Sequence, residues 1–248
     1  MSFKTLISSA ALIGAMAAIT PAANAGDYSA TLDYTSEYVF RGFGLGAESL
    51  QAGVEKSVDG MTFGVWASTG IGEESIINAD EVDIYGGYSW DVKDAITADV
   101  GATLYHYPQA GNLFEVGADE AGTFEVYGGL GFDSPLAPSV YAYYDTTLEV
   151  LTLEGSASHS IAADNGLSFD FGATLGSVNP DEGDGYEYLT GSAAASYGLT
   201  DETSIYLGLN ASTASEDNFY DYEGFVKNGT VDPDSSTLWW GVGLSTSL

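Results

Sequence analysis

The feature that most constrains this chain is a period-two alternation of apolar and polar residues. It is clearest at residues 28–40, where one parity holds Tyr28, Ala30, Leu32, Tyr34, Tyr38 and Phe40 and the other holds Ser29, Thr31, Asp33, Thr35 and Glu37. Successive side chains of a β-strand point to opposite faces, so such a segment forms a strand with one apolar face and one wet face. Because the pattern recurs along the chain, we predict an all-β fold.

Twelve segments carry the alternation, and each is predicted to be a strand: 28–40, 48–58, 61–69, 80–90, 96–107, 123–132, 138–145, 150–161, 167–176, 186–199, 203–213 and 237–248. The connections alternate between short turns and longer, more acidic loops, with 146–149 as a short exception. Short turns at one end and long loops at the other are typical of antiparallel, up-and-down outer-membrane β-barrels. An even number of strands then places both termini at the short-turn end, in the periplasm.

The chain has no apolar run of 18 residues after Ala25, so a membrane-spanning helix is not expected there. A sheet can cross a membrane only as a closed barrel, because open edges leave unsatisfied backbone groups in lipid. Aromatic residues near the predicted strand ends are expected to form interfacial girdles: Tyr28, Tyr38, Phe40, Trp90, Phe132, Tyr144, Tyr197 and Trp240. Alternation alone also fits a soluble β-sandwich or lipocalin-like barrel. The strand number, the loop asymmetry, the girdles and the export signal described next favour the transmembrane barrel.

The N-terminal residues have the pattern of an export signal. Lys4 precedes an apolar stretch at 6–19, and Ala23-Asn24-Ala25 reads as an A-x-A cleavage site. We therefore predict a cleaved signal peptide at 1–25 and an outer-membrane β-barrel at 26–248. The alternative for this stretch is a buried N-terminal helix.

The charge of the predicted mature chain excludes some functions. Loss of residues 1–25 removes Lys4 and leaves 4 basic residues against 36 acidic ones, a formal charge of −32. Such a chain repels phosphates, which argues against nucleic-acid binding. The chain has no cysteine, so disulfides and thiolate chemistry are excluded.

Several short blocks resemble one family. They are Ser36-Glu37-Tyr38-Val39-Phe40-Arg41-Gly42, Gly64-Val65-Trp66-Ala67-Ser68, Glu81-Val82-Asp83-Ile84-Tyr85-Gly86-Gly87-Tyr88, Leu104-Tyr105-His106-Tyr107-Pro108, Phe124-Glu125-Val126-Tyr127 and Ala142-Tyr143-Tyr144-Asp145. In this order they resemble the TorF-family porins over about residues 28–200. The resemblance implies a Gram-negative outer-membrane channel-like barrel, and it implies no particular substrate.

The polar parity carries the candidate functional residues. If the apolar face meets lipid, the lumen is lined by Asp33, Glu37, Arg41, Glu55, Glu81, Asp83, Asp99, Glu125, Asp145, Glu154, Asp170 and Glu187. Carboxylates lining a pore favour cations, so we predict a porin-like channel that passes small hydrophilic solutes by diffusion and prefers cations. The alternative is that these acids are only hydrated wall residues. Arg41 could brace a loop across the mouth or be an ordinary interfacial arginine.

Aromatic residues also fall on the inward parity: Trp66, Tyr85, Tyr105, Tyr127, Tyr141, Tyr143 and Tyr206. Such rings can stack on sugars, or they can fill a narrow lumen. The acidic residues of two loops, Asp181, Glu182 and Asp184 in one and Asp217, Asp221, Asp232 and Asp234 in the other, could hold Ca²⁺ or be solvated. No cofactor is implied.

Two rival functions remain open. One is a structural wall protein that bridges lipopolysaccharide without transport. The other is an outer-membrane phospholipase, for which His106 and His159 lie on the outward parity, but no outward serine stands beside either as a nucleophile. We therefore expect no enzyme. The expected partners are outer-membrane lipid, lipopolysaccharide and small solutes or ions, and the oligomeric state is left open from monomer to trimer.

Overall fold

The structure is a computed structural model, and it describes residues 28–72, 80–117, 120–220 and 233–247. The predicted signal peptide at 1–25 lies outside these residues. Within the described residues, no helix is long and apolar enough to span a membrane.

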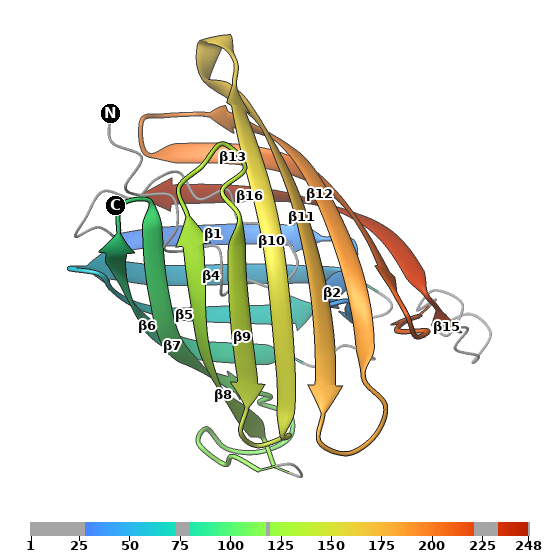
Figure 1. The fold of residues 1–248 in the computed structure, drawn as a ribbon. Coiled ribbons are helices and arrows are strands. Elements are labelled where there is room, and N and C mark those ends of the chain that lie inside the picture. Colours follow the sequence, from blue (N-terminus) through green and yellow to red (C-terminus); the bar gives the residue numbers. More distant parts are fainter. Residues whose placement is uncertain (1–27, 73–79, 118–119, 221–232, 248) are drawn as a thin grey trace.

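Twelve antiparallel strands form a closed barrel, as predicted (Figure 1). In chain order they are β1 (Tyr28–Thr35), β4 (Ser49–Val58), β5 (Met61–Gly70), β6 (Glu81–Lys93), β7 (Ile96–His106), β8 (Gly122–Phe132), β9 (Ser139–Asp145), β10 (Val150–Ala162), β11 (Leu167–Pro180), β12 (Tyr186–Gly198), β13 (Thr203–Ala214) and β16 (Ser236–Ser247). Chain neighbours pair along the sheet, and β1 pairs with both β4 and β16, which closes the ring.

The apolar face of every long strand points outward. Leu32, Val54, Leu175 and Leu209 are each more than half exposed, whereas the polar parity is mostly buried in the interior. An exposed apolar surface of this extent is costly in water and is the surface that lipid covers. The barrel is therefore built for the bacterial outer membrane, and its interior is a polar lumen in place of an apolar core.

In the part of the chain that the structure describes, four short strands lie outside the barrel wall. They are β2 (Tyr38–Phe40), β3 (Phe43–Gly46), β14 (Phe219–Tyr220) and β15 (Pro233–Asp234). β2 pairs with β3, and β14 pairs with β15. A 3₁₀ turn, η2 (Asp164–Gly166), makes one of the short connections.

The first strand differs from the prediction. A single strand over residues 28–40 was expected, but β1 ends at Thr35, and a bend at Ser36 and Glu37 separates it from β2. Residues beyond the bend no longer follow the inward and outward alternation of β1. Tyr38 and Phe40, predicted on the lipid face, lie instead in the interior, where Tyr38 is 6% exposed and packs with Trp66 and Tyr85. The prediction that these two rings belong to the interfacial girdle was wrong.

Candidate functional site

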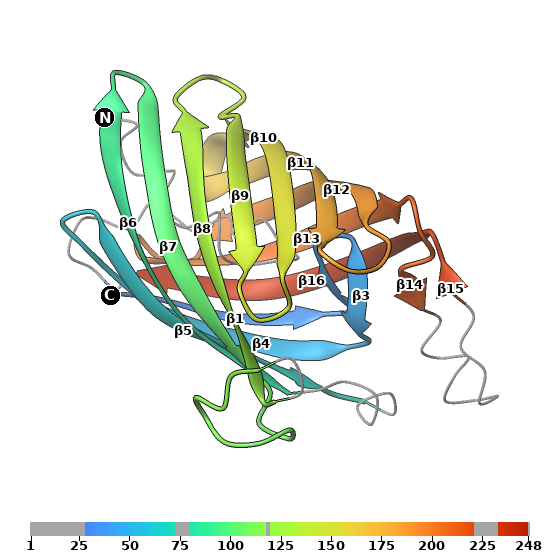
Figure 2. The same ribbon diagram turned by 60° about the horizontal axis from the view of Figure 1, so that its bottom comes forward.

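A hairpin formed by β2 and β3 crosses the lumen at the long-loop end of the barrel (Figure 2). It leaves the wall between β1 and β4, and its tip residue Arg41 contacts Glu125 of β8, Tyr143 of β9 and Glu154 of β10. The order of strands around the ring places β9 and β10 opposite β1 and β4. The hairpin therefore spans the lumen from one wall to the other.

The turn of this hairpin has two residues, Arg41 and Gly42, with φ angles of 47° and 73°. Two-residue hairpin loops commonly need positive φ at both positions, which glycine adopts freely and arginine does not. A Cβ on Gly42 would also overlap the side chain of Tyr188. Contacts made by Arg41 in the lumen offset the unfavourable backbone conformation.

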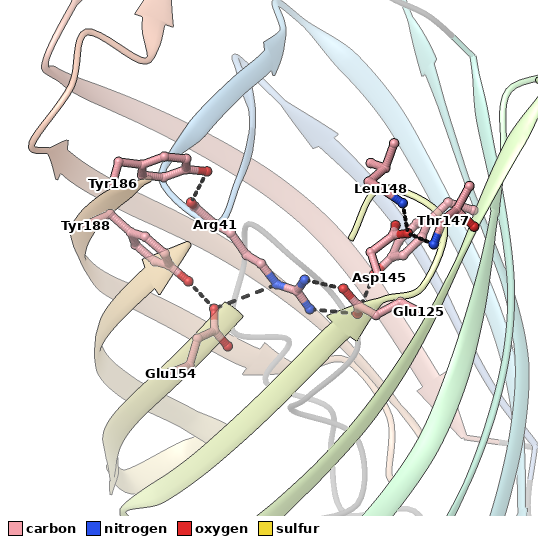
Figure 3. Close-up of polar contacts among 9 residues, drawn as sticks. Arg41, Glu125, Asp145, Thr147, Leu148, Glu154, Tyr186 and Tyr188 are labelled. Atoms are coloured by element: carbon pink, nitrogen blue, oxygen red, sulfur yellow. Dashed lines mark hydrogen bonds and ion pairs between the residues drawn. The ribbon is translucent and has the colours of Figure 1, made fainter. Parts of the chain in front are cut away.

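The guanidinium of Arg41 is bound on several sides (Figure 3). Its Nη1 and Nη2 donate to the two carboxylate oxygens of Glu125 at 2.5 and 2.9 Å. Its Nε lies 4.0 Å from Oε1 of Glu154, and its central carbon lies 3.9 Å from the ring centroid of Tyr143. We call Glu125, Tyr143 and Glu154 the guanidinium seat. Of the two sequence-based readings of Arg41, the brace across the lumen is the one seen.

The rest of the hairpin is anchored along its length. The Tyr38 hydroxyl donates to Glu81 at 2.9 Å, and Val39 packs against Phe219 and Trp239. At the turn, the Tyr186 hydroxyl donates to the carbonyl oxygen of Arg41 at 3.1 Å. The side-chain amide of Asn218 donates to the Gly42 carbonyl at 3.3 Å, and its backbone carbonyl accepts from the Gly44 amide at 3.0 Å. The hairpin is thus bonded to several separate parts of the barrel.

Below and beside the hairpin, four carboxylates follow one geometric rule. Each accepts a hydrogen bond from a tyrosine two strands away. On the strand between them, the residue that pairs with both is glycine, so the three residues form a row across the sheet. The rows are Glu55–Gly64–Tyr85, Asp33–Gly243–Tyr206, Asp99–Gly129–Tyr141 and Glu154–Gly176–Tyr188. In each row the tyrosine ring covers the glycine, where an added Cβ would overlap it. The rule holds these lumenal acids in fixed positions on the wall.

The remaining predicted lumenal residues have varied surroundings. Glu37 accepts from Thr237, Glu81 accepts also from Tyr107, Glu125 accepts also from Tyr105, and Asp170 accepts from Ser168. Burial and the charge of Glu81 raise the pKa of Tyr107, which lies just beyond β7, so its hydroxyl stays a proton donor. Asp83 is 7% exposed beside Glu81 on the same strand.

Two acids play other roles. Asp145 accepts from the backbone amides of Thr147 and Leu148, both at 2.8 Å, and so caps the tight turn after β9. Glu187 was predicted to face the lumen, but it is exposed and shares the outward parity of Leu189, so that prediction was wrong. Alternation counted from the apolar Leu189 would have placed Glu187 on the outward face.

The structure brings together some residues that sequence reasoning missed. Tyr188 and Tyr186 lie at the hairpin tip, and both share the inward parity of Thr190, so the parity rule could have found them. Tyr38 and Asn218 could not be found by that rule. Tyr38 follows the bend after β1, and Asn218 lies in a loop.

We expect Gly64→Ala to destabilise the barrel by about 1–3 kcal/mol, the usual cost of forcing an extra methyl into a packed site. The added Cβ would overlap the ring of Tyr85, which must then move away from Glu55. Gly191→Ala is the matched control, because a Cβ there meets nothing within 4 Å. Urea unfolding of both variants in lipid vesicles measures the difference. Equal stability of both variants would contradict the packing described for Tyr85.

Candidates for other chemistry are not brought together. His106 is buried at the end of β7, and the Nδ1 of the exposed His159 lies 2.6 Å from the Pro135 carbonyl oxygen. Among the described residues, no group of three or more acids or histidines could hold a metal ion. Asp221 and Asp232, named as loop candidates for Ca²⁺, lie outside the described residues.

Three solved structures with a similar fold are named as porins or outer-membrane channels. The chain is similar to the KdgM porin, with 9% identity and a TM-score of 0.58 over 89% of this chain and 99% of that one. It is similar to the NanC porin, with 14% identity and a TM-score of 0.59 over 89% and 100%. An outer membrane channel from Pseudomonas putida F1 shares 12% identity, with a TM-score of 0.53 over 93% and 98%. At these identities the similarity concerns the fold.

Sequence comparison adds the family. No curated protein matches the chain. A family profile matches residues 20–222, which is most of the chain. The porin-like barrel implied by the resemblance to TorF-family porins is confirmed as a fold. These matches do not identify the chain as a member of the TorF family. On this match, the chain belongs to the family described as bacterial protein of unknown function (Gcw_chp).

Proposed function

We propose that the protein is an outer-membrane channel through which small hydrophilic solutes diffuse passively, with a preference for cations. The observation that carries the proposal is the charge of the lumen. Its inward side chains include the carboxylates described above, and Arg41 is the only cation facing them among the described residues. Lys56 lies on the outer wall against Tyr28, and Lys93 is exposed beside a short turn.

Polar side chains line the wall beside the hairpin. Gln51 Nε2, Trp66 Nε1 and Asp83 Oδ1 lie on the neighbouring strands β4, β5 and β6, and each is buried without a protein partner. A hydrophilic solute would therefore meet polar groups on this part of the wall.

The mechanism needs no covalent step. A solute would move down its gradient past fixed carboxylates, and the β2–β3 hairpin would form the narrowest part of the path. At this constriction, Glu125 and Glu154 face one guanidinium and Glu81 and Asp83 lie nearby. The charge there is net negative when these acids are ionised, which favours cations over anions.

Solute permeation into liposomes tests the proposal. Lysine, glutamine and glutamate are similar in size and differ in charge, so their relative swelling rates report charge preference. We expect lysine to enter fastest and glutamate slowest through the refolded barrel. If a correctly folded, heat-modifiable barrel admits none of the three faster than protein-free liposomes do, the proposal is wrong and a non-transporting wall protein is the better account.

A further inference from the structure

The guanidinium seat is assembled by the barrel wall and not by the hairpin that occupies it. Glu125, Tyr143 and Glu154 belong to β8, β9 and β10, which pair with one another in a continuous sheet. The wall also orients both acids. Tyr105 donates to Glu125 at 3.1 Å. Tyr188 donates to Glu154, as Figure 3 shows. The acids of the seat are therefore held by the wall as well as by Arg41.

An empty seat would be electrostatically unfavourable. The side chain of Glu125 is only 5% exposed and that of Glu154 is 18% exposed. Removing the cationic partner of a buried carboxylate leaves an uncompensated charge, which is strongly destabilising. Without Arg41, the seat would attract another cation from the lumen.

The geometry selects a particular kind of cation. The fork of two parallel N–H groups matches the two oxygens of Glu125, and the planar group stacks on the Tyr143 ring. A compact, strongly hydrated ion such as K⁺ or a primary ammonium can supply the charge but neither the fork nor the plane. The seat is thus complementary to a guanidinium.

We propose that the seat is a recognition site for guanidinium-bearing solutes, and that Arg41 occupies it until such a solute displaces it. This inference rests on the proposed channel function and names a solute class for it. A guanidinium solute would form the same two hydrogen bonds to Glu125 and the same stacking contact. The displaced hairpin tip would then leave the far wall of the lumen.

Ethylguanidinium is the probe, and ethylurea, which has a similar shape and no charge, is its control. In Arg41→Ala the seat is open, and millimolar ethylguanidinium is expected to block the single-channel current while ethylurea does not. Wild-type protein is expected to need at least about tenfold more ethylguanidinium for the same block, because the probe must first displace Arg41 from the seat. A tenfold difference corresponds to about one charge-assisted hydrogen bond. Adding Glu125→Gln to Arg41→Ala is expected to abolish the block.

Two further variants keep the test decisive. Arg41→Met retains side-chain length without charge, in case the alanine variant does not fold. Lys56→Met removes a cation that also lies over a ring, that of Tyr28, but on the outer wall. It should respond to the probe as wild type does.

A second measurement does not depend on transport. Ethylguanidinium, and not ethylurea, is expected to raise the thermal unfolding midpoint of Arg41→Ala in detergent, because a ligand that binds only the folded state stabilises it. If neither stabilisation nor block is seen in a folded Arg41 variant, the recognition site is wrong even if the channel conducts. If no variant conducts, the channel proposal fails, and the unfolding midpoint alone decides whether the seat binds guanidinium.

Discussion

Shortening the β2–β3 hairpin is expected to raise the single-channel conductance of the barrel several-fold. The hairpin crosses the lumen and places Tyr38, Phe40 and Arg41 in it, so its removal widens the narrowest part of the path. Thr35 of β1 pairs with Ser49 of β4, so Ser36 and Glu48 can be joined by an Asn-Gly dipeptide in place of residues 37–47. Asn-Gly is a preferred two-residue hairpin loop, which lets the wall stay closed.

The control for this variant is a shortened loop that does not enter the lumen. Residues 182–184, between β11 and β12, are exposed, so deleting them should leave the conductance unchanged. Planar-bilayer recording of both proteins, after heat-modifiability shows that each has folded, gives the comparison. An unchanged conductance in the hairpin variant would mean that the hairpin does not lie on the conduction path.

Neutralising lumenal acids is expected to lower the permeability ratio of K⁺ to Cl⁻ several-fold. Glu55→Gln, Asp99→Asn and Asp170→Asn change three inward residues of β4, β7 and β11 and do not touch the guanidinium seat. Their hydrogen-bond partners include the hydroxyls of Tyr85, Tyr141 and Ser168, which can donate equally to an amide oxygen. The fold should therefore survive while the lumen loses negative charge. The effect should be largest at low salt, where screening is weakest.

A matched triple variant separates lumenal charge from total charge. Asp59, Asp133 and Asp201 are exposed at short turns, and changing all three to Asn removes the same formal charge outside the lumen. Its permeability ratio is expected to equal that of wild type. Equal losses of selectivity in both triple variants would show that the field of the whole protein, and not the lumenal wall, sets the preference.

Most of the barrel could be predicted because its signal is local and repeated. A strand with one face in lipid and one in water must alternate, and the predicted and observed strand ends agree within a few residues from β4 onward. Once the outward parity is known, the inward residues follow, which is why Asp83, Glu125 and Tyr206 were placed on the lumenal side.

The hairpin could not be predicted from the same rule. The apolar parity of β1 continues in the sequence through Tyr38 and Phe40. Alternation predicts the face of a side chain only within one continuous strand, and the bend at Ser36 and Glu37 interrupts that strand. Arg41-Gly42 is not a strong turn signal, since arginine disfavours positive φ. The conformation depends on contacts with Glu125 and Tyr143, which lie far along the chain, and no local pattern reveals them.

The tyrosine–glycine–carboxylate rows show an intermediate case. The parity of Tyr85, Gly64 and Glu55 could be read from the sequence, and each residue was placed on a strand. The three residues share one row because of the register of β4, β5 and β6. That register is set by turns and packing. Residue type and face were therefore predictable, and the contacts were not.

The reversal potential under a KCl gradient tests the central claim most directly. It should be measured in planar bilayers for wild-type protein and for the hairpin-shortened variant. We predict discrete openings in both, larger in the variant, with a reversal potential of the sign that K⁺ selectivity requires. Folded barrels that show no conductance in either form, or a reversal potential of the opposite sign, would contradict a cation-preferring channel through this lumen.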